Sequence, residues 1–310
     1  MPALPQLDAD LFLTDGGIET TLVFDDGIDL PDFAAFPLLD DPDGRSALVR
    51  YFDRYASIAE RDGVGIVLET PTWRANPDWA ERRGYNSQSL DKANRAAVDL
   101  LLDIRRRFAI PVVISGCVGP RHDGYHPETI MSREEAGNYH AEQIKTFART
   151  EADLVTAITM TNVPEATGIT DAARQENLPV VISFTVETDG TLPTGETLKE
   201  AIEATDRATN SYPAYYMVNC AHPTHFASVL DPEAPWTKRI KGIRANASKL
   251  SHTELDEAEQ LDRGDPDELA ADYLRLRNNH PQLTVLGGCC GTDHRHIAKI
   301  SSVVAGTAPA

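Results

Sequence analysis

Short apolar runs alternate with longer amphipathic segments along the whole chain. The apolar runs are rich in β-branched residues, and their length is that of buried strands. They lie at residues 11–14, 66–68, 112–115, 154–158, 180–184, 214–219, 240–244 and 284–286. Strands that alternate with helices indicate βαβ units in a parallel sheet. Eight such runs predict an α/β fold that closes into a (β/α)8 TIM barrel.

The segments between these runs carry helix signals. Helical patterns lie at residues 47–61, 87–108, 132–150, 265–278 and 292–304. Ser132 precedes Glu135 by three residues, which is the spacing of a capping box. The stretch 246–264 is the least regular and is rich in acidic residues. It is either a loop over the active-site end of the barrel or a solvated insertion.

We expect residues 1–310 to form one domain. Barrels of this type commonly reach this length as a single unit, and no change of composition marks a boundary. No G-x-G-x-x-G motif follows the first predicted strand. The pattern therefore does not favour a dinucleotide-binding fold.

Charge and composition narrow the class of partner. The net charge of −19 argues against nucleic acids and anionic membranes, because both bind clustered positive charge. No apolar run is long enough to span a bilayer, and the N-terminus lacks the features of a signal peptide. We therefore expect a cytoplasmic protein that binds small molecules, and a homo-oligomer is left open. The acidic composition indicates either ordinary surface solvation or adaptation to high salt.

The cysteines carry the strongest chemical signal. The chain has four, of which Cys220 ends the sixth predicted strand, and Cys289 and Cys290 follow the eighth on a glycine-rich turn. The C-terminal ends of the strands meet at the active-site face of a barrel. Three thiols there could hold a tetrahedral zinc ion and leave its fourth position open. Cys117, after the third strand, is expected to be a small buried residue.

A three-thiolate zinc site favours one kind of reaction. Three thiolates lower the Lewis acidity of the ion, so the site suits hydrolysis poorly. It suits a substrate thiol, because coordination lowers the pKa of the thiol and keeps its sulfur nucleophilic at neutral pH. The natural reaction is S-alkylation by an activated methyl donor. The residues thus predict one Zn²⁺ per chain, a small-molecule thiol and a methyl donor.

Asp15, Gly16 and Gly17 end the first predicted strand. The glycines allow a ligand to approach the backbone N–H groups closely, and the carboxylate could hold a substrate ammonium. An ordinary Asp-Gly turn would have the same sequence.

Histidines lie close to the cysteines in the sequence. His222 and His225 follow Cys220, and we expect His222 to cap a helix or to support the site rather than to bind the ion. A zinc hydrolase, with His222 or His225 as a ligand and Asp15 as the base, is an alternative that these residues leave open. His294 and His296 are expected at the surface.

Together these motifs resemble those of the zinc-dependent homocysteine S-methyltransferases, which include the betaine–homocysteine and S-methylmethionine–homocysteine enzymes. The resemblance spans nearly the whole chain and is carried by residues 14–20, 115–120, 182–185, 194–198, 218–220 and 287–292. The last motif, with the upstream Asn-Cys pair, is highly specific. The family implies a (β/α)8 barrel that transfers a methyl group to homocysteine and gives methionine. S-methylmethionine, S-adenosylmethionine or a betaine-like compound would be the donor.

The resemblance also implies roles for individual residues. Cys220, Cys289 and Cys290 would bind the zinc ion. Asp15, with the backbone of Gly16 and Gly17, would contact the amino acid group of homocysteine. Thr70 and Asn219, at strand ends, are further candidates for substrate contacts, and Glu69, Glu187, His222 and Asn246 are candidates for supporting positions around the site.

The chain departs from the family pattern in two places. Ile158 stands where the family has a glutamate that helps to hold the substrate ammonium, and Glu69 or Glu187 would have to compensate. Residues 244–247 replace a frequent Pro-Asn-x-Gly pattern on the side of the methyl donor. The acceptor could therefore be a different thiol, or the barrel could bind a thiol or zinc without catalysis.

Overall fold

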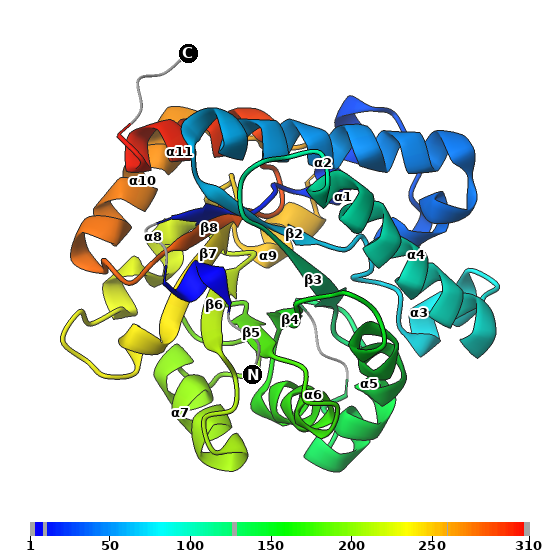
Figure 1. The fold of residues 1–310 in the computed structure, drawn as a ribbon. Coiled ribbons are helices and arrows are strands. Elements are labelled where there is room, and N and C mark those ends of the chain that lie inside the picture. The colour runs from blue at the N-terminus through cyan, green and yellow to red at the C-terminus, as the bar shows by residue number, and fades with distance from the viewer. Residues whose placement is uncertain (1–3, 9–10, 126–128, 259, 307–310) are drawn as a thin grey trace.

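The computed structural model describes residues 4–8, 11–125, 129–258 and 260–306. Its eight strands run parallel and close into a barrel, in which each strand pairs with the next and β8 pairs with β1 (Figure 1). The strands are β1 (Phe12–Leu13), β2 (Gly65–Glu69), β3 (Val112–Val118), β4 (Leu154–Met160), β5 (Val180–Phe184), β6 (Tyr215–Asn219), β7 (Ile240–Ala245) and β8 (Val285–Gly288). The predicted TIM barrel is confirmed.

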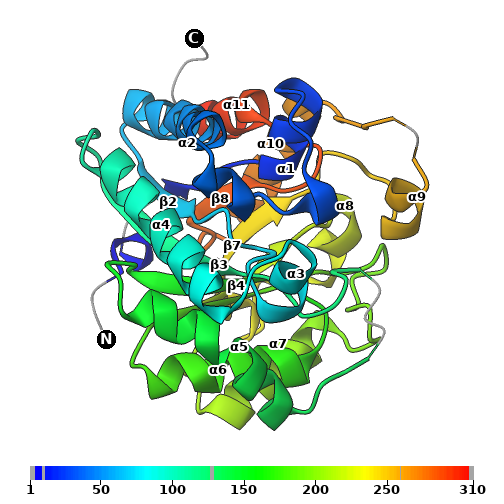
Figure 2. The same cartoon turned by 90° about the vertical axis from the view of Figure 1, so that its right-hand side faces the viewer.

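Helices cover the outside of the barrel, as two perpendicular views show (Figure 1, Figure 2). The long helices are α2 (Pro42–Asp62), α4 (Ser87–Arg105), α5 (Arg133–Ala148), α6 (Val163–Gln175), α7 (Leu198–Thr209), α10 (Pro266–Asn279) and α11 (His294–Val304). The short ones are α1 (Ile18–Thr20), α3 (Pro77–Arg82), α8 (Pro223–Phe226) and α9 (His252–Asp256). Within the described ranges, none combines the length and the apolar character that a bilayer crossing requires.

Side-chain caps set the starts of the helices. The Asp41 carboxylate accepts a hydrogen bond from the Gly44 N–H at 2.7 Å, and Pro42 occupies the first position of α2. This helix begins earlier than the hydrophobic pattern predicts, because the cap and the proline satisfy its polar first turn. The predicted capping box of Ser132 and Glu135 is confirmed at the start of α5.

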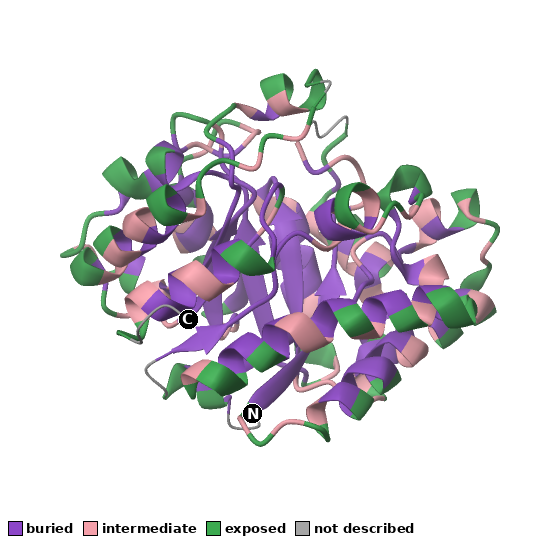
Figure 3. Ribbon diagram, turned by 90° about the horizontal axis from the view of Figure 1, so that it is seen from above, coloured by how far each residue is buried: buried purple, intermediate pink, exposed green. Residues whose placement is uncertain are grey.

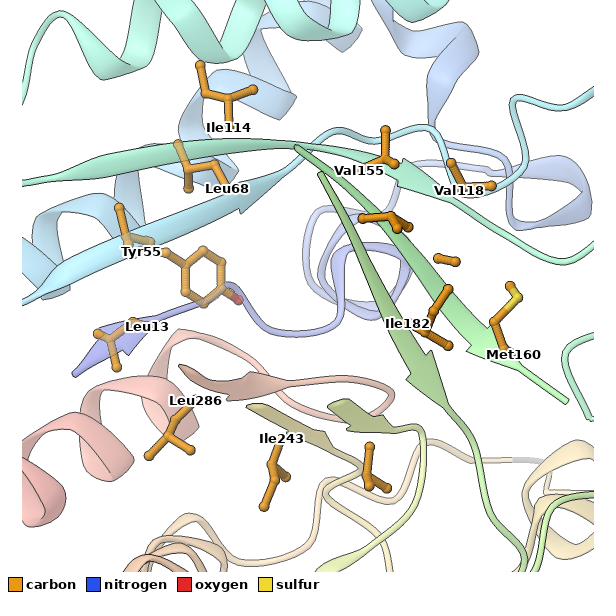
Figure 4. Close-up of a cluster of buried hydrophobic side chains, with 14 of the residues drawn as sticks. Leu13, Tyr55, Leu68, Ile114, Val118, Val155, Met160, Ile182, Ile243 and Leu286 are labelled. Carbon is orange, nitrogen blue, oxygen red and sulfur yellow. The ribbon is translucent and has the colours of Figure 1, made fainter. Parts of the chain in front are cut away.

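Successive side chains along each strand point to opposite faces of the sheet, and this creates two hydrophobic layers. Leu13 and Leu286 lie in the layer between the strands and the helices (Figure 4). Their neighbours Phe12 and Val285 belong to a second cluster that fills the barrel, as the two-residue period of a strand requires. Buried residues run through the strands, whereas exposed ones lie on the outer faces of the helices (Figure 3).

A polar layer follows this apolar filling toward the C-terminal ends of the strands. The hydroxyl groups of Ser115 and Thr156 are 2.7 Å apart, and the Ser183 hydroxyl donates to Asn219 at 2.6 Å. These residues continue the inward-facing positions of the apolar cluster. Because buried polar groups require partners, the paired layer forms a rigid floor below the mouth of the barrel.

Candidate active site

Three cysteines converge at the C-terminal end of the barrel. Cys220 follows β6, and Cys289 and Cys290 follow β8. Their Sγ atoms all lie within 4.8 Å of one another. The sulfurs of Cys220 and Cys289 are in direct contact, with Cα atoms 5.5 Å apart, and could pair as a disulfide. In the described part of the chain, no other three histidine, cysteine or carboxylate side chains gather as closely.

The backbone at Cys220 has an unusual conformation. Its φ is 54°, and Thr159 in β4 has a φ of 64°, a region that residues with a branched Cβ rarely adopt. Asn219 links the two strand ends, because its Oδ1 accepts the Thr159 N–H at 3.0 Å and its Nδ2 donates to the Thr159 hydroxyl at 2.9 Å. Such strain persists only where the surroundings enforce it. Asn219 is therefore a positioning residue for Cys220.

The carbonyl oxygen of Cys220 is held from a second side. Asn246 Nδ2 donates to it at 3.0 Å, and His252 Nε2 lies 2.7 Å away. His252 is fixed in turn by Glu187, with Nδ1 3.1 Å from Oε1, and by the Tyr125 ring stacked at 4.0 Å. These contacts orient the main chain that carries the sulfur of Cys220.

The donor set fits a zinc ion. Zinc–sulfur bonds of about 2.3 Å place the sulfurs of a tetrahedral site roughly 4 Å apart, and all three Sγ atoms lie within 4.8 Å of one another. The sulfurs of Cys220 and Cys289, which are in contact, would separate as reduced thiolates around the ion. Soft thiolate ligands favour zinc over magnesium or calcium. All three cysteines border one cavity, so a small molecule in that cavity can reach the sulfurs.

This cavity has a volume of about 360 Å³ and lies at the mouth of the barrel. Asp15, Glu69 and Arg244 line it from the strand ends, beside Ile158. Of the two interpretations of the stretch 246–264, the loop over the site is confirmed. Its residues in the cavity lining include Ser248, Leu255, Leu261 and Asp262.

Arg244 and Asp15 form a buried ion pair in the cavity. Nη2 of Arg244 lies 2.6 Å from Oδ1 of Asp15, and the Tyr51 hydroxyl donates to Oδ2 at 3.0 Å. Arg244 also donates to the carbonyl oxygens of Gly16 and Gly288, at 3.3 and 3.2 Å. Burial raises the pKa of Asp15, and the guanidinium opposes that rise. The carboxylate assigned to a substrate ammonium thus already has a cation and a phenol as partners.

Glu69 lies close to this ion pair. Its side chain is buried, and Oε2 has no hydrogen-bond partner among the described residues. Burial raises the pKa of Glu69 from 4.5 to about 7; Arg244 opposes the rise and Asp15 adds to it. Between these two pH values the folded protein keeps a proton that the unfolded chain has released. Stability therefore falls as the pH rises across this window.

Replacing Glu69 with glutamine is expected to stabilise the protein increasingly as the pH rises, because the amide cannot ionise in the buried site. The gain at about pH 8 should be on the order of 3 kcal/mol, and it should be small below about pH 5. Urea unfolding at several pH values measures it. Glu142→Gln, on the exposed face of α5, is the control. A gain from Glu69→Gln that does not vary with pH would contradict this account.

The remaining residues assigned to substrate contacts differ in their access to the cavity. Thr70, Gly16 and Gly17 line it. The Gly17 N–H, however, donates to the carbonyl oxygen of Thr292 at 3.1 Å. Asn219 is fully buried and is not part of the cavity lining. Its observed contacts are with protein groups.

The two histidines after Cys220 have other partners. His222 caps α8, as predicted, and its Nδ1 accepts the Thr224 N–H at 3.3 Å. Burial lowers its pKa to about 4. His225 Nε2 lies 3.0 Å from the carbonyl oxygen of Lys249. Neither histidine belongs to the sulfur cluster, so the hydrolase interpretation lacks its ligands.

Two predictions about individual side chains have different outcomes. The surface position predicted for His296 is wrong, because its Nδ1 accepts the Asp293 N–H at 3.1 Å and its Nε2 lies 2.9 Å from the Arg263 carbonyl oxygen. These bonds bury the ring against the loop before α10, whereas His294 is exposed as expected. Cys117 is buried and lies outside the sulfur cluster, as expected.

Several residues around the cavity were not predicted from the sequence. Arg244 was predicted only as part of the departure from the family pattern at residues 244–247. Because alternate side chains of a strand face the same side, its position two residues after the inward-facing Gly242 indicates that it faces the barrel interior. Tyr125 places its hydroxyl 3.4 Å from the sulfur of Cys290. Tyr125 lies in a loop and His252 begins the short helix α9, and neither segment is long enough for a periodic pattern to indicate which side chains face the site.

The fold and the site define a TIM-barrel protein with three clustered thiols at the face where the active sites of such barrels lie. A family model described as homocysteine S-methyltransferase matches residues 12–304. The chain belongs to this family and is a methyltransferase. The resemblance inferred from the sequence motifs is thereby confirmed.

Individual relatives match over most of their length. Homocysteine S-methyltransferase 1 of Arabidopsis thaliana is 22% identical over 312 residues, which cover 93% of this chain and 92% of the relative. The protein of the same name from Brassica oleracea var. italica is 22% identical over 261 residues, 77% of each chain. The metallated form of the homocysteine methyltransferase MmuM from Escherichia coli has a TM-score of 0.75 at 20% identity, with 95% of this chain and 96% of that chain covered. The structural likeness supports the barrel fold.

Proposed function

We propose that this protein is a zinc-dependent S-methyltransferase whose acceptor is homocysteine and whose donor is a small sulfonium or quaternary ammonium compound, such as S-methylmethionine. The main support is the group of three sulfur atoms that lie within 4.8 Å of one another and whose cysteines border the cavity. The family match supports the acceptor. The metallated form of the Escherichia coli relative supports a metal at the thiols.

Cys220, Cys289 and Cys290 would hold the zinc ion, which when bound lowers the pKa of an acceptor thiol. The residues around the cysteines hold the metal ligands in place. Asn219 and His252 fix the backbone of Cys220. The cavity would bring the acceptor sulfur and the donor methyl group together. Methyl transfer between two bound substrates is then effectively unimolecular, which lowers its entropic barrier.

In the proposed reaction the acceptor sulfur attacks the methyl carbon of the donor in line. A carbon–sulfur bond forms while the bond from the methyl group to the sulfonium centre breaks, and its electron pair stays on the donor sulfur. The thiol proton leaves to solvent. Homocysteine and S-methylmethionine then give two molecules of methionine.

A different thiol acceptor is the second candidate, and two observations favour it. Ile158 provides an apolar surface in the cavity where the family pattern has a glutamate. Asp15 is already paired with Arg244. A thiol without an amino group needs neither carboxylate, so 4-mercaptobutanoate, which is homocysteine without its amine, is the natural comparison.

Zinc-loaded protein is expected to convert homocysteine and S-methylmethionine to methionine. Removal of the metal with a chelator should lower the rate by more than about 100-fold, and added zinc should restore it. Product analysis by mass spectrometry and metal analysis of the same samples measure both. Turnover of 4-mercaptobutanoate without turnover of homocysteine would favour the second candidate. Full zinc occupancy without turnover of either thiol would reject the proposed function.

A further inference from the structure

The proposed substrates carry positive charge, and the carboxylates of the cavity are not equally able to bind it. Asp15 is engaged by Arg244 and Tyr51. Glu187 contacts His252 and is not part of the cavity lining. A substrate cation therefore needs another carboxylate that borders the cavity and has no counter-ion of its own.

Glu69 also borders the cavity, but its side chain is buried against the hydroxyl groups of Ser115 and Thr156. Glu19 is only half-buried and meets both conditions. It borders the cavity that contains the three cysteines. Among the described residues, only its own backbone N–H is a hydrogen-bond partner of its carboxylate. Burial raises the pKa of Glu19 to about 7, as expected for a carboxylate without a nearby bound cation.

Short contacts fix Glu19 next to the cysteine turn. Glu19 lies in α1, and the residues on both sides of it are bonded to that turn. The Gly17 N–H donates to the carbonyl oxygen of Thr292 at 3.1 Å, and the Gly291 N–H donates to the Thr20 hydroxyl at 3.0 Å. These bonds hold α1 against the turn that carries Cys289 and Cys290.

Other charges face Glu19 without neutralising it. Arg74 and Arg244 lower the pKa of Glu19, whereas Asp15 raises it. Arg244 is paired with Asp15. Arg74 donates to the carbonyl oxygen of His122 at 3.1 Å, and its guanidinium lies 4.0 Å from the ring centre of Trp73. Arg74 also lies 3.8 Å from the Asp123 carboxylate. Among the described residues, neither arginine forms an ion pair or a hydrogen bond with Glu19, which borders the cavity.

We propose that Glu19 is the carboxylate that binds the cationic group of a substrate, either the ammonium group of the acceptor thiol or the onium centre of the methyl donor. This inference rests on the proposed methyl transfer. It accounts for an apolar residue at position 158, because Glu19 supplies the negative charge from α1 instead of from the end of β4. Glu19 borders the same cavity as the three cysteines, and burial together with the charge of Glu19 raises the pKa of the Cys290 thiol.

The test compares wild-type protein with Glu19→Gln, which removes the charge, and Glu19→Asp, which keeps it. Each is assayed with homocysteine or 4-mercaptobutanoate as acceptor, and with S-methylmethionine or uncharged methyl iodide as donor. Glu142→Gln, on the exposed face of α5, is the matched control. Glu19→Gln should raise the KM of the substrate whose cation Glu19 binds by roughly 10- to 100-fold and change kcat less. Glu19→Asp should recover part of the loss.

The pattern of losses identifies the bound cation. A loss with homocysteine that disappears with 4-mercaptobutanoate assigns Glu19 to the acceptor ammonium. A loss with S-methylmethionine that disappears with methyl iodide assigns it to the donor. KM values within about twofold of wild type, or equal losses in all four combinations, would overturn the proposal.

Calorimetric titration of wild-type and Glu19→Gln protein with homocysteine and with S-methylmethionine provides a readout that does not depend on turnover. The variant should bind one of the two ligands at least about 10-fold more weakly. This experiment tests the role of Glu19 separately from the proposed methyl transfer. If wild-type protein methylates no thiol, the proposed function fails, and equal binding of both ligands by wild type and variant would make the Glu19 assignment fail independently.

Discussion

Replacing Cys290 with alanine is expected to abolish stoichiometric zinc binding and to lower methyl transfer by more than about 100-fold. Two sulfurs cannot complete the three-ligand set of a catalytic zinc site, and even the loss of a group that only supports a ligand costs roughly 10- to 100-fold in affinity or activity. Metal analysis after dialysis and the methionine assay measure the two effects. A Cys290→Ala protein that retained one zinc per chain would contradict the assignment of the site.

The matched control is Cys117→Ala. Cys117 is a buried thiol that borders the same cavity but lies outside the sulfur cluster. The variant has the same number of thiols as Cys290→Ala and is expected to keep its zinc. Loss of metal from both variants would indicate a general effect of thiol removal on the fold, and circular dichroism of each would show it.

Replacing Arg244 with methionine is expected to destabilise the protein by about 3–5 kcal/mol, because Asp15 would then be buried without its counter-ion. The side chains of Arg244 and Asp15 are only 7% and 3% exposed. Arg244 also donates to the carbonyl oxygens of Gly16 and Gly288, so its loss would leave acceptors in two strand-end segments without a donor. Urea unfolding at neutral pH measures the change.

A double-mutant cycle isolates the ion pair from these other contacts. Asp15→Asn removes the buried charge, so Arg244→Met should cost less in the Asp15→Asn background than in wild type. A coupling energy of about 1–3 kcal/mol between the two positions is expected. Additive effects of the two substitutions, or a cost of Arg244→Met below about 1 kcal/mol, would show that the pair does not stabilise the fold.

The barrel was predictable because its signal repeats. Each strand is a short apolar run between helical segments. Misplacing the limits of one predicted strand therefore leaves the alternating pattern of eight strands unchanged. The limits of single elements were less predictable. β1 contains only Phe12 and Leu13, although the apolar pattern extends over residues 11–14, because ladder bonds to β2 and β8 define the strand. The start of α2 depends on the cap at Asp41, which lies outside the hydrophobic pattern.

The convergence of the cysteines was predictable once the barrel was assumed, because strand ends in a parallel barrel share one face. The contacts that surround the cysteines were not. Arg244 donates to the Gly16 carbonyl across a separation of 228 residues, and no local pattern indicates such a partner. His252 reaches the carbonyl oxygen of Cys220 from the first position of the short helix α9. These contacts depend on the curvature of the closed sheet, which a linear sequence does not display.

The pairing of β1 with β8 joins Phe12 to Val285 and Leu13 to Leu286. The same closure brings Asp15 beside Arg244 and α1 against the turn that holds Cys289. During translation, Asp15 can meet Arg244 only after β7 has been synthesised, and β1 can pair with β8 only after residue 288. Nascent fragments that end before β8 lack two of the three sulfurs and the strand that closes the barrel. The complete thiol set and the closed barrel therefore cannot form before residues 285–290 have been synthesised.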